Sequence, residues 1–216
     1  MHHAIRPLPF KPGSFPGLSE RLLASHYENN YGGAVRRLHA IERRVAALDA
    51  ATAPGFDWIG LKREELIAYN SMVLHEVYFD GLGPPSDPPA DLLRVLEADF
   101  ASLDAWRSQF AALGRALGGG SGWVVLALGR RDGRLRNQWA ADHTAMLADS
   151  APVLALDMYE HSYHLDFGAN AGAYVEAYFR CLDWRRPAER WRAALGLAAR
   201  AAADPEALTP EELLAA

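Results

Sequence analysis

The sequence predicts an α+β protein built in two parts. The first is an N-terminal antiparallel helical hairpin, and the second is a C-terminal domain with a three-stranded antiparallel sheet and flanking helices. Three observations support this. Apolar residues recur at three- and four-residue steps over two long N-terminal stretches. A Pro- and Gly-rich segment, residues 81–90, then divides the chain into domains 1–85 and 86–216. Beyond it, short apolar runs of strand length alternate with helical stretches.

The N-terminal part contains two periodic stretches. The first spans about residues 20–48, and the glycine pair Gly32–Gly33 is expected to bend or split this helix. Residues 50–60 are expected to form a connector, and the second helix is expected from Lys62 to about Phe79. Two long helices joined by a short loop pack as an antiparallel hairpin.

The C-terminal part combines helices with strands. Residues 130–133 (RRDG) have the composition of a hairpin turn between two strands. We expect the three strands to form a small antiparallel meander, and the tail 209–216 to be a short helix or a frayed end. The predicted helices cover about residues 91–100, 103–117, 170–184 and 187–203, and the strands cover 123–129, 134–140 and 152–158.

The amino-acid composition of the chain argues against several classes of function. The chain has 216 residues, is 50% hydrophobic and 23% charged, and has a formal net charge of −5, which is typical of a globular protein. The acidic balance argues against nucleic-acid binding, and no apolar run is long enough to cross a membrane. With the single cysteine Cys181, no intramolecular disulfide can form. The start of the chain lacks the apolar core of a signal peptide, so we expect a cytoplasmic protein.

Four residues have the types and positions of a metal site. Asp157 and His161 leave the end of an apolar strand together, and a buried carboxylate and imidazole need either a metal or each other as partner. Both alternatives are open for this pair alone. His26 and His75 lie on otherwise apolar helix faces that an antiparallel hairpin can bring to one level. Three imidazoles and one carboxylate suit a first-row transition metal and leave a position for water or substrate.

Several motifs resemble the iron/manganese superoxide dismutase family, and the resemblance covers nearly the whole chain. The motifs are LSERLLASHY (18–27), YNSMVLHEVYF (69–79), SGWVVL (121–126), LDMYEHSYHLDF (156–167) and CLDW (181–184). The resemblance implies that His26, His75, Asp157 and His161 hold one iron or manganese ion per subunit. It also implies that superoxide is the substrate, converted to dioxygen and hydrogen peroxide. Finally, it implies a homodimer in which Glu160 reaches the ligand histidine of the partner subunit.

The resemblance also points to residues around the metal. His143 lies where the family places a glutamine or histidine that hydrogen-bonds solvent at the metal, and the small Ser71 leaves room for it. Trp123 and Tyr78 match the family pattern. The substrate gate departs from that pattern. The departures are Asn30 for a histidine, Ala34 for a tyrosine, Tyr159 for a tryptophan, His164 for a tyrosine and Ala171 for an arginine.

These departures have expected consequences. Asn30, Ala34 and His164 should lie close together, and His164 should replace part of the proton relay because imidazole titrates near neutral pH. Loss of the tyrosine at residue 34 should open the site to larger ligands. The candidate catalytic residues are therefore His143, Tyr78, His164 and Asn30.

Three hypotheses remain for the function. The first is a superoxide dismutase with an atypical gate. The second is a metalloprotein of the same fold with a different redox or hydrolytic activity. The third is a non-catalytic module of the same fold. The ligand set alone does not select among iron, manganese and zinc, because all three metals accept three imidazoles and a carboxylate.

Overall fold

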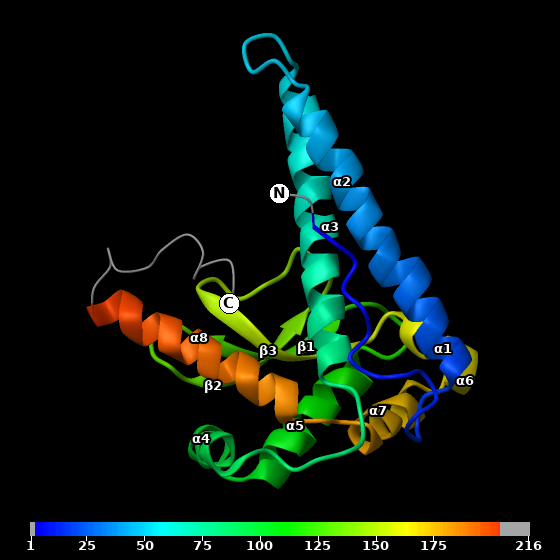
Figure 1. The fold of residues 1–216 in the computed structure, drawn as a ribbon, viewed down its shortest axis with the longest axis vertical. Coiled ribbons are helices and arrows are strands. Elements are labelled where there is room, and N and C mark those ends of the chain that lie inside the picture. The colour runs from blue at the N-terminus through cyan, green and yellow to red at the C-terminus, as the bar shows by residue number, and fades with distance from the viewer. Residues whose placement is uncertain (1–2, 204–216) are drawn as a thin grey trace.

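The computed structural model describes residues 3–203, with side chains described through residue 196. A long helical hairpin projects from a body in which further helices surround a small sheet (Figure 1). The elements in chain order are α1 (Glu20–Ser25), η1 (His26–Tyr31), α2 (Gly32–Ala46), α3 (Gly55–Asp80), α4 (Ala90–Phe100), α5 (Leu103–Ala116), β1 (Trp123–Gly129), β2 (Leu135–Ala140), β3 (Ser150–Asp157), η2 (Glu160–Ser162), α6 (His164–Phe167), α7 (Ala171–Arg180) and α8 (Arg185–Ala203).

The first half of the hairpin is continuous but not uniform. Ser19 caps α1, because its hydroxyl oxygen accepts the backbone N–H of Leu22 at 3.0 Å. The sequence predicts a bend or split at Gly32–Gly33, and the helical stretch does change type there, because α2 begins at Gly32. The irregularity is a π-helical turn, His26–Tyr31, that ends just before the glycines. A π-helical turn contains one extra residue and therefore changes which side chains face the partner helix.

Helix α3 is longer than predicted and begins at Gly55 rather than Lys62. Its N-terminal end follows Pro54, and Asp57 lies in the first turn, where a carboxylate favours the helix dipole. Phe56 and Ile59 in this extension are 77% and 74% exposed. Because this part of α3 buries no apolar stripe, the periodicity that marks the rest of the helix is missing there.

The sheet is antiparallel, as predicted, with β1 at its centre. All seven residues of β1 are buried. Since alternate side chains of a strand point to opposite faces, helices must cover both faces of β1. Helices α3 and α8 contact β3, whereas α4 and α5 contact β2. The centre of the hydrophobic core therefore lies along β1.

The strand order is β2-β1-β3, so the prediction of a simple meander is wrong. β1 and β2 form the predicted hairpin around residues 130–133. The segment between β2 and β3 then returns the chain to the other edge of β1, where Trp123 pairs with Asp157. This order agrees with the composition of the strands, because β1, the most apolar of the three, lies at the centre of the sheet between the other two. It also brings Asp157 beside the start of β1.

The segment 81–89 joins the helical hairpin to α4, and the proposed boundary at residues 85 and 86 falls within it. The predicted helices on either side of the sheet are present, with ends that differ by a few residues. No helix among residues 3–203 is long and apolar enough to cross a membrane. The predicted tail structure at 209–216 lies outside the described residues.

Candidate metal centre

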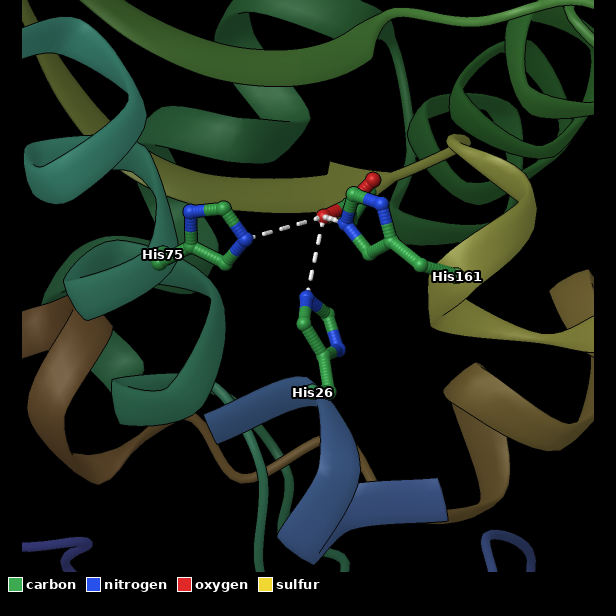
Figure 2. A group of neighbouring side chains, drawn as sticks. His26, His75 and His161 are labelled. Atoms are coloured by element: carbon green, nitrogen blue, oxygen red, sulfur yellow. Dashed lines mark hydrogen bonds and ion pairs between the residues drawn. The ribbon is translucent and has the colours of Figure 1, made fainter. Parts of the chain in front are cut away.

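His26, His75, Asp157 and His161 converge on one point between the hairpin and the sheet (Figure 2). One ligand-type atom from each residue lies within 4.8 Å of all the others. The Asp157 Oδ2 atom is 3.1 Å from His26 Nε2, 3.2 Å from His161 Nε2 and 3.6 Å from His75 Nε2. The antiparallel hairpin thus places both helix histidines at one level, as the sequence predicts.

Each side chain comes from a different element. His26 begins the π-helical turn, and His75 lies near the C-terminal end of α3. Asp157 is the last residue of β3, and His161 follows in the short 3₁₀ turn η2. Figure 2 shows the three histidines approaching from separate directions, which is the arrangement that a mononuclear metal requires.

The orientation of His75 prepares it to bind a metal. Its Nδ1–H donates to the backbone carbonyl of Ser71 at 2.6 Å, so the lone pair is on Nε2. That Nε2 atom is buried and has no hydrogen-bond partner. A buried acceptor without a partner is costly, and a cation at the centre of the four residues would satisfy it. The residues present therefore fit a transition-metal ion.

At three of the four groups, His75, His26 and Asp157, the surroundings favour the protonation state that a metal needs. Burial lowers the pKa of His75 to about 3, and burial also lowers the pKa of His26. Burial raises the pKa of the Asp157 carboxyl, but interactions with His161 and His26 outweigh it, so the net pKa is lowered. Neutral imidazoles and an ionised carboxylate are the forms that coordinate metals.

His143 lies next to this group but is not part of it. Its ring centroid is 6.4 Å from that of His75. The indole N–H of Trp123 donates to His143 Nδ1 at 3.0 Å, and the Asn70 amide donates to the His143 backbone carbonyl at 2.5 Å. His143 thus lies beside the four converging residues, and its predicted role at the site stays a prediction.

The other predicted catalytic residues lie in varied positions. Tyr78 is fully buried, its ring centroid is 5.0 Å from that of His26, and its hydroxyl oxygen is 3.3 Å from that of Tyr174. Asn30 is half-buried in the π turn. His164 is exposed at the start of α6, and no interaction with Asn30 or the four converging residues is found for it in the described part of the chain. The proposed relay role of His164 stays a prediction.

Two of the residues that depart from the family pattern, Ala34 and Ala171, are buried. Ala34 is only 7% exposed, so the loss of a tyrosine does not leave this part of α2 open to solvent. Ala171 is buried at the start of α7. Neither position is a surface opening in the single chain. The expectation that the site admits larger ligands stays a prediction.

Sequence reasoning missed several contacts at the site. Tyr159 stacks on His143 with ring centroids 4.8 Å apart and planes 9° apart. The Tyr174 hydroxyl donates to the backbone carbonyl of Asp157 at 2.8 Å. Tyr31, fully buried, places its ring 6.4 Å from that of His75. The only signal in the sequence for these contacts was the aromatic residues in and around the motifs. The sequence does not show which of those residues contact one another.

Comparison with known proteins agrees with this geometry. Residues 88–190 match the family described as iron/manganese superoxide dismutases, C-terminal domain. The chain is 57% identical to "Superoxide dismutase [Fe]" of Cupriavidus metallidurans, over 90% of this chain and 99% of that protein. It is 31% identical to "Superoxide dismutase [Mn] 2" of Haloferax volcanii, over 91% and 99% of the two chains. It is 30% identical to "Superoxide dismutase [Fe]" of Aquifex aeolicus, over 89% and 93%.

These relatives cover almost the full length of the chain, including the helical hairpin. The similarity therefore extends well beyond the C-terminal domain. Together with the convergence of three histidines and an aspartate, it establishes the identity that the motifs suggest. The chain belongs to the iron/manganese superoxide dismutase family.

Proposed function

We propose that this protein converts superoxide to dioxygen and hydrogen peroxide at a single iron or manganese ion held by His26, His75, Asp157 and His161. The observation that carries the proposal is the buried convergence of three imidazole nitrogens and one carboxylate oxygen within 4.8 Å. Two superoxide ions and two protons give one dioxygen and one hydrogen peroxide. When bound, the metal supplies the one-electron redox chemistry that links the two halves of this reaction.

The chain's own residues would do the remaining work. Asp157 supplies the anionic ligand, and the carbonyl of Ser71 orients His75 by accepting its Nδ1–H. His143 would donate a hydrogen bond to solvent or substrate at the site. Tyr78 and Tyr174 close the centre with buried aromatic surface, which excludes bulk water around Asp157.

Iron is the metal we favour. The relative with 57% identity bears the name of an iron enzyme, whereas the manganese relatives share about 31% or less. His143 supports the same choice by family resemblance. Metal analysis of the protein purified from cells grown with equal iron and manganese tests this preference, and a manganese-loaded active protein would contradict it.

We further propose a homodimer in the cytoplasm, with Glu160 near the interface. The His161 side chain is 28% exposed, although the other three converging side chains are 0–1% exposed. Glu160 is exposed beside it. A second copy covering this edge would bury His161, and a carboxylate from that copy would orient its imidazole. Light scattering of the wild type and of Glu160→Ala tests the dimer.

The decisive experiment measures superoxide consumption by the purified protein, normalised to bound iron and manganese. Rapid turnover per metal ion, well above that of the free ions, is expected. A protein that binds metal but consumes little superoxide would refute the proposal and favour another redox or hydrolytic reaction. A protein that binds no metal would favour a non-catalytic module.

A further inference from the structure

A hydrogen bond joins the two halves of the helical hairpin beside the candidate metal centre. Tyr31 ends the π-helical turn that begins with His26, and Glu76 follows His75 on α3. The Tyr31 hydroxyl donates to Glu76 Oε1 at 2.9 Å. This bond therefore links, across the hairpin, the turn that carries one proposed ligand to the residue next to another.

The N-terminal segment holds this connection from outside the hairpin. The segment before α1, dark blue in Figure 1, runs beside α3. The Arg6 backbone N–H donates to the Tyr31 hydroxyl oxygen at 2.9 Å, and the Arg6 guanidinium lies 3.3 Å from Glu76 Oε2. The Arg6 carbonyl accepts the hydroxyl of Tyr27, in the same π turn, at 2.9 Å. One residue of the N-terminal segment thus contacts both sides of the hairpin.

Packed aromatic rings connect Tyr31 to both helix histidines. The Tyr31 ring is buried, with its centroid 6.4 Å from that of His75 and 6.3 Å from that of Phe79. The Phe79 centroid lies 5.1 Å from that of His26 and 6.4 Å from that of His75. The Glu76 side chain is only 12% exposed. Because a close-packed interior transmits small displacements, a shift of Tyr31 would move both imidazoles.

We propose that Tyr31 and Glu76 are positioning residues that brace the hairpin at the metal centre. Their hydrogen bond fixes the separation of His26 and His75, whose ring centroids are 5.0 Å apart. Arg6 keeps the Glu76 carboxylate in place. A site that is already arranged for its ligand binds more tightly, because less freedom is lost on binding. This inference rests on the proposed function for the use of the metal, but the brace acts on metal binding and does not depend on turnover.

Binding of Co²⁺ to the full-length, metal-free protein tests the brace. Co²⁺ accepts imidazole and carboxylate ligands, and its visible absorption spectrum depends on how those ligands are arranged. Tyr31→Phe retains the buried ring and removes the hydroxyl. This variant should bind Co²⁺ about twofold to about tenfold more weakly, for the loss of one hydrogen bond, and with a changed spectrum. Tyr69→Phe is the matched control, because Tyr69 on α3 is 45% exposed, and it should retain the wild-type affinity and spectrum.

A double-mutant cycle shows whether the two positioning residues act together. Glu76→Leu removes the acceptor and should weaken Co²⁺ binding at least as much as Tyr31→Phe. The double variant should bind no more weakly than Glu76→Leu alone, because both substitutions break the same bond. Glu76→Gln retains an oxygen that can accept the Tyr31 hydroxyl, so it should bind Co²⁺ more tightly than Glu76→Leu. Arg6→Ala, at a side chain that is 66% exposed, should weaken binding in the wild type but not in Glu76→Leu.

The outcomes distinguish this inference from the proposed function. Wild-type affinity and spectrum in folded Tyr31→Phe would overturn the brace, and so would losses of affinity that simply add in the double variant. If Tyr31→Phe does not fold, equal affinities of Glu76→Leu and Glu76→Gln would overturn it. The expected changes in Co²⁺ binding, in a protein without superoxide turnover, would refute the proposed function and support the brace. Rapid turnover with unchanged Co²⁺ binding in the variants would do the reverse.

Discussion

Acidification of the metal-free protein should weaken the fold through His75. Burial lowers the pKa of His75 to about 3, from an ordinary value of 6.5. Between these two pH values the unfolded chain binds a proton at residue 75 and the folded chain does not. Stability therefore rises with pH across this window and falls as the solution becomes more acidic. The slope approaches about 1.4 kcal/mol per pH unit for one such group.

From pH 6.5 to pH 4.5, His75 alone should then reduce the free energy of unfolding by about 2 kcal/mol. The lowered pKa values of His26 and His143 act in the same direction. The lowered pKa of Asp157 has its effect at more acidic pH, below the ordinary pKa of 3.8. Urea denaturation with a chelator present, at pH 6.5, 5.5 and 4.5, measures the total loss.

The variant His75→Gln isolates the contribution of His75. Its stability should fall less over the same two pH units, by about 2 kcal/mol, whatever its stability at pH 6.5. His164→Gln, which removes an exposed histidine rather than a buried one, is the matched control. Equal pH dependence in His75→Gln and the wild type would show that the folded protein does not exclude a proton from this imidazole.

Three other substitutions test the site and the core. His75→Ala should abolish stoichiometric metal binding, measured by elemental analysis, and a full metal equivalent in this variant would contradict the ligand assignment. Gly122→Ala should destabilise the protein in thermal denaturation by more than 1 kcal/mol, because φ is +134° and the new Cβ would lie 2.3 Å from a backbone carbonyl oxygen. Gly60→Ala, in open space on α3, is its control and should stabilise the fold by about 0.5–1 kcal/mol. Leu126→Ala, at the fully buried centre of β1, should cost about 2–5 kcal/mol in urea denaturation, and a loss below 1 kcal/mol would mean that the core around β1 readjusts to fill the cavity.

The sequence by itself determined the fold class and the four converging residues. Apolar periodicity marked the helices wherever one face is buried, and β1 was predicted with its observed ends because its apolar run is bounded by glycines. His26 and His75 were found because polar side chains on apolar helix faces stand out. The N-terminal part of α3, which contains Phe56 and Ile59, was not predicted because it has no buried apolar face. Apolar periodicity indicates which side of a helix is buried and does not indicate the backbone conformation itself.

The tertiary structure decided the strand order and the environment of the metal centre. Strand order depends on which edge of β1 the returning chain meets, and alternation within a strand carries no information about its neighbours. The π turn at His26–Tyr31 is a local departure of the backbone that regular periodicity does not encode. The contacts of His143 with Trp123 and Tyr159 join residues 16–20 positions apart, so they depend on the pairing of β1 with β2 and with β3. Residue types can be read from a sequence, but hydrogen-bond partners at such separations are set by how the strands and helices pack.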